Sequence, residues 1–243
     1  MKIKDALQLT EKQFDGEEFL KRQGSYQHDS EWDNNLFWDN ERISNDVKSQ
    51  KIDSLHVRND DFLRYPIIIN LLKKIKTLPK DFSLIDLGCG MAGVLNEIKK
   101  EFRYSNLYGV DALPVGHLFE LKSVGGNIVK SNEIIFKFYE LDFMELLELD
   151  FQCDVALMLN LYHAPGVFKV GEGLESFMKN LEKGISSNFD YFVTLLNCEQ
   201  YKSFKDGEFH YSKIPVKIIY NEPMKVGDSS VSQWVVIKFK KKS

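Results

Sequence analysis

The stretch Ile85–Gly93, with the sequence IDLGCGMAG, decides the fold of this chain of 243 residues. Apolar residues at Ser83–Leu87 predict a buried strand that leads into it, and Gly93–Phe102 predicts a helix that follows. Glycine at positions 88 and 90 lets the backbone turn sharply between the two and approach a ligand closely. The stretch therefore predicts a strand, a tight turn and a helix whose N-terminus faces a bound molecule.

The alternation of strand and helix continues along the chain. A helix is expected over residues 64–75, before the first strand, and the pattern then predicts strands at 106–110, 135–140, 155–159 and 191–196 and helices at 115–122 and 174–183. Repeated alternation of this kind predicts an α/β fold, with a mostly parallel sheet and helices on both faces. Two more strands, at 216–220 and 233–239, lack a helical link, so we expect a seven-stranded sheet that ends in an antiparallel pair.

Residues 1–65 differ from the rest, because they are polar and rich in acids yet contain several aromatic residues, among them Phe14, Phe19, Tyr26, Trp32, Phe37 and Trp38. We expect short helices here, one near residues 16–23, that form a helical N-terminal cap over the active site of a catalytic domain at residues 66–243. A loosely attached arm, whose aromatic side chains fill surface grooves, is the alternative.

Composition excludes several classes of protein. A net charge of −4 and a pI near 5.8 disfavour tight binding to a phosphate backbone, so no nucleic-acid partner is expected. No apolar run is long enough for a membrane span or a signal peptide. Cys89, Cys153 and Cys198 are far apart, without metal-ligand spacing. We expect a cytoplasmic protein without a membrane partner, and the sequence does not indicate the oligomeric state.

Two carboxylates occupy informative positions. The second strand ends at Asp111, which is 25 residues after Asp86 (111 − 86), and a carboxylate there can accept both hydroxyls of an adenosine ribose. Nicotinamide enzymes and methyltransferases share this acid. Asp86 separates them, because a carboxylate two residues before the first glycine repels a pyrophosphate but suits a cationic amino acid group.

These features resemble the class I S-adenosylmethionine-dependent methyltransferases, which have a Rossmann-like fold. The resemblance depends on Ile85–Gly93, on Val110–Ala112 and on the order of strands and helices. It covers roughly residues 83–200 and also the antiparallel strand pair at the end of the chain. It implies that S-adenosylmethionine is the cofactor, that the glycine turn holds its methionine part, and that Asp86 lies beside the methionine amino group. The cofactor-binding residues expected in this part are Asp86, Gly88, Cys89, Gly90, Gly93, Asp111 and Ala112.

The resemblance implies three further cofactor contacts. Asp142 follows the third strand, where an acid of the family accepts from the adenine amine, and Phe143 then covers the ring. Asn160, at the end of the fourth strand, lies under the methionine part. The alternatives are that Asp142 only caps a helix, that Phe143 is buried without a ligand contact and that Asn160 only caps its strand.

His163 is the expected catalytic residue, since a neutral imidazole can take a proton from a hydroxyl near pH 7. The family often has a histidine at this place. A loop histidine bonded to a backbone carbonyl is the alternative. Tyr162 is expected to orient the substrate, and Tyr26 and His28 are expected to reach it from the cap.

The residues after the fourth strand narrow the substrate. Asn160–His163 reads NLYH, which replaces the Asn/Asp-Pro-Pro-aromatic motif of the methyltransferases that modify base amines. We therefore expect O-methylation of a small molecule, a sugar or nucleotide-linked sugar. The alternatives are a phenol, a carboxylate or an amine as acceptor, a non-catalytic binding protein, and an NAD-dependent oxidoreductase. No metal is expected. The nearest candidate ligands at the ends of the fourth and fifth strands are Asn160, Asn197 and Glu199, and they do not include the pair of aspartates that metal-dependent O-methyltransferases use.

Overall fold

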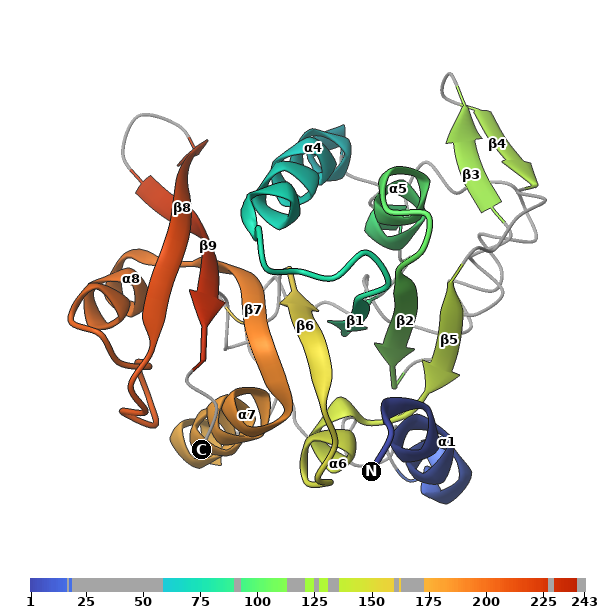
Figure 1. The fold of residues 1–243 in the computed structure, drawn as a ribbon, viewed down its shortest axis with the longest axis horizontal. Coiled ribbons are helices and arrows are strands. Elements are labelled where there is room, and N and C mark those ends of the chain that lie inside the picture. The colour runs from blue at the N-terminus through green and yellow to red at the C-terminus, as the bar shows by residue number, and fades with distance from the viewer. Residues whose placement is uncertain are drawn as a thin grey trace, which may run out of the picture.

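Seven strands form a single twisted sheet in this computed structural model of the chain (Figure 1). The structure describes residues 1–16, 18, 59–89, 93–112, 121–124, 127–130, 136–159, 162, 173–226 and 230–239. The strand order is β5-β2-β1-β6-β7-β9-β8. The strands are β1 (Ser83–Leu87), β2 (Asn106–Asp111), β5 (Lys137–Glu140), β6 (Cys153–Met158), β7 (Phe189–Leu196), β8 (Lys217–Val226) and β9 (Ser230–Lys238).

The direction of the strands confirms the predicted α/β fold class. β5, β2, β1, β6 and β7 pair in parallel, as strands joined by helical crossovers do. β9 runs antiparallel to both β7 and β8, so the antiparallel pair at the end of the chain is also confirmed. Its strands are longer than expected, because pairing continues from Lys217 with Lys238 to Val226 with Ser230.

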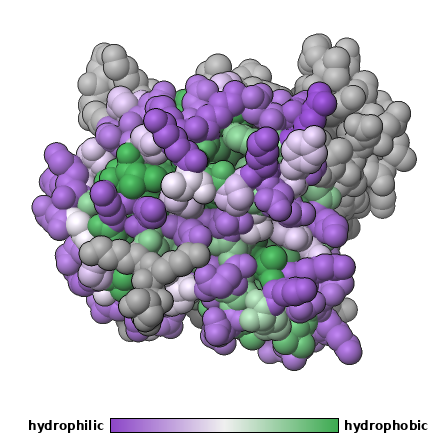
Figure 2. Space-filling model, viewed as in Figure 1, coloured by the Kyte–Doolittle hydropathy of each residue, from purple (hydrophilic) through white to green (hydrophobic). Residues whose placement is uncertain are grey.

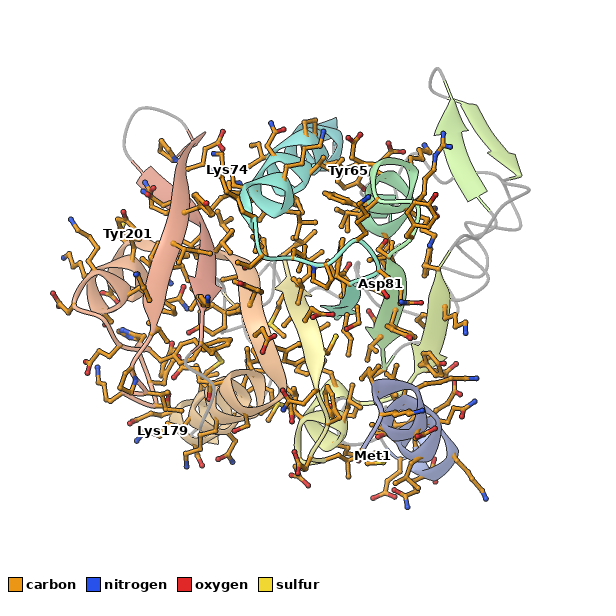
Figure 3. The ribbon with its side chains drawn as sticks, viewed as in Figure 1. Met1, Tyr65, Lys74, Asp81, Lys179 and Tyr201 are labelled. Carbon is orange, nitrogen blue, oxygen red and sulfur yellow. The ribbon has the colours of Figure 1, made fainter. Side chains whose placement is uncertain are left out.

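Helices cover both faces of the sheet. α4 (Asn59–Lys74) and α5 (Gly93–Glu101) lie above it in Figure 1, whereas α1 (Ile3–Gln13), α6 (Phe143–Leu147) and α7 (Leu174–Asn188) lie below, and α8 (Cys198–Lys205) lies beside β8. Successive residues of a strand point to opposite faces. Leu84 of β1 accordingly packs in the core between the sheet and helices α4 and α5. Ile85 packs in the core on the opposite face, between the sheet and helices α6 and α7. Side chains fill both spaces (Figure 3).

Two expected helices differ from the structure. The helix before the first strand ends at Lys74, although its apolar spacing continued to Ile75. Residues 121–122 were expected at the end of a helix, but Leu121–Val124 forms β3, which pairs antiparallel with β4 (Asn127–Lys130). The sequence between paired Val124 and Asn127 is Gly-Gly, which two-residue hairpin turns prefer, so this signal was present.

α1 lies in the N-terminal segment where short helices were expected, although no helix was predicted at these particular residues. Ala6, Leu7 and Thr10 of this helix are buried, and the helix packs against α6 and β5. The backbone of Lys2 also bridges to Gln152, just before β6. The helix expected near residues 16–23 and most of the expected cap lie outside the described residues.

No helix among the residues that the structure describes has the length and apolar character needed to cross a bilayer. On the face drawn in Figure 2, hydrophilic side chains predominate and apolar ones form small separate groups.

Close packing of α7 against α6 depends on Gly184. A Cβ at this position would lie 2.7 Å from Leu147 Cβ and 3.1 Å from the Leu147 carbonyl oxygen. Gly184→Ala should therefore lower the free energy of unfolding by about 1–3 kcal/mol in urea titrations, although alanine ordinarily stabilises a helix interior. Gly173→Ala is the control, because no atom of the described residues lies within 4 Å of its added Cβ. Equal stability of the two variants would contradict the packing described here.

Candidate cofactor site

Three acidic side chains lie where neighbouring parallel strands end. β1, β2 and β5 are adjacent, and their register places Asp86 opposite Gly109 and Asp111 opposite Glu140. By alternation along each strand, these three acids point to the face that α4 and α5 cover. The carboxyl ends of parallel strands are where α/β proteins bind ligands. The sheet therefore gathers three carboxyl groups at the edge where a ligand is expected.

The glycine turn after β1 has the predicted form. Gly88 has a φ of 70°, in the left-handed region that favours glycine. The backbone N–H groups of Gly88 and Cys89 both donate to the carbonyl oxygen of Val110, at 2.8 and 3.0 Å. α5 then begins at Gly93, while Gly90 lies outside the described residues. The turn is thus tied to the end of β2, directly beside Asp111.

Gly109 lets the turn pack onto β2. A Cβ on this residue would lie 3.0 Å from the Cys89 Sγ, 3.2 Å from Leu95 and 3.3 Å from Phe136. Any larger side chain would push the turn and α5 away from the strand. An isolated glycine within a strand is a known signal of such a close approach, so Gly109 could have been predicted from the sequence.

Asp86 is a buried acid without a described hydrogen-bond donor. Its side chain is 2% exposed, and none of the residues placed by the structure donates a hydrogen bond to its carboxyl group. Burial, and then the nearby charge of Asp111, raise the pKa of Asp86 from 3.8 to about 8. A carboxyl group buried in this way destabilises a protein unless a ligand completes its contacts, so it marks a candidate functional site.

Further acidic groups extend the negative charge along the edge. Asp111 is 8% exposed, and a Glu11 carboxylate oxygen from α1 accepts the backbone N–H of Glu140 at 3.2 Å. Burial, followed by Glu11 and then Asp111, raises the pKa of Glu140. Burial, followed by Asp86 and then Asp111, raises the pKa of the Cys89 thiol well above its usual value. Glu11 and Glu140 were not among the predicted site residues, because only the tertiary fold brings α1 to the end of β5.

This arrangement suits a ligand that carries positive charge or adjacent hydroxyl groups. A carboxylate near a cation regains the stabilisation that burial removed, and its two oxygens can accept two neighbouring hydroxyls. A phosphate would instead meet the negative charge of Asp111 and would oppose the ionisation of Asp86, whose pKa is already raised. The electrostatics of the edge therefore select against a phosphate beside Asp86 and Asp111.

Asp142 and Phe143 lie next to this edge. The backbone N–H of Leu141 donates to the Asp111 carbonyl oxygen at 3.0 Å, and Asp142 then caps α6 by accepting the Met144 N–H at 2.9 Å. The helix-capping role considered for Asp142 is thus observed, and its contact with an adenine stays a prediction. Phe143 is largely buried in the core below the sheet. Ala112 is half-buried, directly after Asp111.

Tyr162 does not lie where its expected contact with the substrate would require. Its side chain is fully buried, and its hydroxyl donates to the Glu182 carboxylate at 2.6 Å. A ring that is enclosed by the core has no exposed surface that could contact a substrate. Glu182 carried no signal in the sequence beyond its place on the amphipathic helix α7.

The other candidates divide into two groups. Asn197 caps α8 through a reciprocal pair of hydrogen bonds with Gln200, and Glu199 is exposed, so the cap accounts for the Asn197 side chain. Within the described residues, no group of three or more His, Cys, Asp or Glu side chains could hold a metal. Outside them lie the remaining site predictions, which are Tyr26, His28, Gly90, Asn160 and His163.

Comparison with known proteins gives remote structural similarities only. No family model and no curated protein matches the chain. TrmN from Thermus thermophilus is 14% identical with a TM-score of 0.49, and the match covers 72% of this chain and 49% of TrmN. A putative class I S-adenosylmethionine-dependent methyltransferase from Listeria monocytogenes is 14% identical with a TM-score of 0.49, over 84% of this chain and 69% of that one.

The plantazolicin methyltransferase BpumL, solved with a desmethyl substrate analogue and SAH, is 18% identical with a TM-score of 0.42. That match covers 70% of this chain and 57% of BpumL. The chain thus spans about half the length of TrmN and less than two thirds of BpumL. At such similarity, the function has to be inferred from the residues of the chain itself.

Proposed function

We propose that the chain is an S-adenosylmethionine-dependent methyltransferase that moves a methyl group to a hydroxyl oxygen of a small molecule. The observation that carries the proposal is the buried Asp86 carboxyl group. It lies two residues before the left-handed Gly88, at the same sheet edge as Asp111, and no described residue donates a hydrogen bond to it.

Asp86 favours this cofactor over a dinucleotide. S-adenosylmethionine carries an ammonium group on its methionine part, and an ammonium beside Asp86 would supply the missing donors. A dinucleotide would bring a pyrophosphate to the glycine turn instead. Two unit charges of like sign at about 4 Å repel by roughly 4 kcal/mol near a protein surface, so that ligand is disfavoured while Asp86 is ionised.

The remaining cofactor contacts follow from the geometry of the edge. Asp111 accepts the ribose hydroxyls, and the backbone of residues 88–90 approaches the methionine part. Asp142, which caps α6, is proposed to accept the adenine amine as well. Phe143 is proposed to pack on the adenine and Asn160 to bond the methionine part. These roles rest on the resemblance as well as on position.

The reaction is an in-line displacement at the methyl carbon. When bound, the cofactor supplies a methyl group on a sulfonium sulfur, which leaves with the electron pair of the broken carbon–sulfur bond. His163 takes the proton of the substrate hydroxyl while the oxygen forms the new bond to carbon. The protein's main task is to align the oxygen with the carbon–sulfur bond and to exclude water.

A small hydroxylated acceptor, a sugar or nucleotide-linked sugar, is the proposed substrate class. The acidic strand ends and the net charge of −4 disfavour a polyanion, and the sequence NLYH lacks the motif of base-amine methyltransferases. The aromatic, Asn and Gln residues of the segment 1–65 suit stacking and hydroxyl recognition. A phenol, a carboxylate or an amine is the alternative within the same reaction.

A screen of acceptors tests the proposal. The purified chain is incubated with S-adenosylmethionine and panels of sugars, nucleotide sugars, phenols, carboxylates, amines and RNA, and the products are weighed by mass spectrometry. We expect one added methyl group on a hydroxyl acceptor. Cofactor binding with no methylated product in any panel would instead support a binding protein, and methylation of RNA alone would contradict a small-molecule substrate.

A further inference from the structure

Tyr162 is held at both ends by buried polar groups of two different helices. Its hydroxyl donates to the Glu182 carboxylate of α7 at 2.6 Å, and its backbone carbonyl accepts the Gln200 side-chain amide of α8 at 2.7 Å. All three side chains are at most 1% exposed. The Tyr162 ring packs against Phe192, Phe204 and Phe209, with ring centroids 5.3, 6.3 and 6.4 Å away.

Glu182 needs the Tyr162 hydroxyl. The buried carboxylate accepts the backbone N–H groups of Tyr211 and Ser212, and Tyr162 is the one described side chain that donates to it. No lysine or arginine among the described residues pairs with it. A buried carboxylate is tolerated when donors satisfy it, and it is costly when one of them is removed. Burial, and then Glu182, raise the pKa of Tyr162, so its hydroxyl stays a donor.

Gln200 is fixed in turn by the start of α8. Its backbone N–H donates to the Asn197 side chain at 2.9 Å, and its own side-chain oxygen accepts the Asn197 N–H at 3.1 Å. This reciprocal pair holds the amide group in the orientation that reaches the Tyr162 carbonyl. Position 162 is therefore fixed relative to β7, which ends just before Asn197.

Tyr162 lies in the chain between two residues of the proposed site. It is two residues after Asn160 and directly before His163, and neighbouring Cα atoms are only about 3.8 Å apart. Fixing both the side chain and the carbonyl of Tyr162 thus restricts where these neighbours can be. Displacing a reacting group by about 1 Å can lower turnover on the order of 100-fold.

We infer that Glu182 and Gln200 are positioning residues, which act through Tyr162 to place Asn160 and His163 at the end of β6. The inference rests on the proposed function for its catalytic consequence. Its structural part, the attachment of the segment after β6 to α7 and α8, can be tested without any activity.

Tyr162→Phe is the test variant, because phenylalanine keeps the buried ring and removes only the hydroxyl. Tyr191→Phe is the matched control: Tyr191 is also a buried tyrosine, and its hydroxyl bonds Thr77 at the other end of β7. The first measurement is amide hydrogen exchange in peptides that span residues 159–165. We expect it to become at least about tenfold faster in Tyr162→Phe than in the control.

The second measurement is steady-state kinetics with an acceptor found in the screen. We expect the kcat of Tyr162→Phe to fall by on the order of tenfold and the KM for the cofactor to rise by about threefold, because both His163 and Asn160 lose their positioning. Glu182→Gln should lower kcat as well, and the double variant should lose little more than Tyr162→Phe, because both changes break one interaction.

Unchanged exchange at residues 159–165, or an equal increase in the control variant, would overturn the inference. A uniform increase over the whole sheet would also overturn it, since that outcome indicates a general loss of stability. If exchange changes as expected but no acceptor is methylated, the attachment of Tyr162 stands and the proposed function fails.

Discussion

Asp86→Asn is expected to weaken the binding of S-adenosylhomocysteine by on the order of 100-fold. Asparagine has nearly the same shape but carries no negative charge to pair with the methionine ammonium, and a hydrogen bond to a charged group contributes about 1.5–3 kcal/mol. Isothermal titration calorimetry measures the change. Asp154→Asn is the control, because Asp154 binds Ser83 at the start of β1 and is remote from the glycine turn. Equal affinities of wild type and Asp86→Asn would remove Asp86 from the site.

The same interaction predicts a pH dependence of binding. Since the pKa of Asp86 is raised to about 8, the empty site holds a neutral carboxyl group at lower pH. The ammonium prefers the carboxylate, so binding must release this proton. Affinity should therefore rise about tenfold per pH unit from about pH 5.5 to 7.5 in the wild type, and this rise should be absent in Asp86→Asn. A flat wild-type profile would contradict the pKa assignment.

Asp86 should also limit the stability of the protein without its cofactor. The folded state holds the proton up to about pH 8, whereas the unfolded chain releases it near 3.8, so the contribution of this group to stability is greatest below pH 3.8 and is lost as the pH rises to 8. Asp86→Asn should accordingly unfold at higher urea concentration than the wild type at pH 8. The gain should be on the order of 2–4 kcal/mol, and much smaller at pH 5. A variant that is less stable at both pH values would contradict this.

His163→Ala is expected to lower kcat by on the order of 100-fold or more, because an alcohol is a poor nucleophile until a base removes its proton. The affinity for S-adenosylhomocysteine should stay within about twofold, since the imidazole is proposed to touch the substrate only. Single-turnover assays with a saturating cofactor measure the rate of the chemical step. His210→Ala is the control, because this histidine bonds Ser203 on α8. Turnover equal to that of the wild type would remove the assignment of His163.

The sheet could be predicted because the apolar pattern of each strand is visible in its own few residues. Parallel strands such as β6 are buried on both faces, and its last four residues, Val155–Met158, accordingly form a short continuous apolar run. The position of Asp86 and Asp111 at one edge followed from this, since the carboxyl ends of parallel strands meet there. α1 could not be predicted in the same way, because its apolar residues have meaning only once α6 and β5 provide a surface.

The site itself was predictable in part. The glycine turn has a local signature, because a left-handed backbone at Gly88 restricts the residue type. Glu11 and Glu140 have no such signature, and they meet only because α1 packs on the end of β5. The burial of Tyr162 was missed for a similar reason: Glu182 is 20 residues away in the chain and offers its carboxylate only in the folded protein.

Calorimetric titration of the wild type at about pH 7.5, with S-adenosylhomocysteine and NAD in separate runs, tests the identity of the ligand most directly. We predict saturable binding of S-adenosylhomocysteine at one site per chain, with proton release to the buffer, and no detectable heat with NAD. Binding of NAD, or failure to bind S-adenosylhomocysteine by protein that is shown to be folded, would contradict the account.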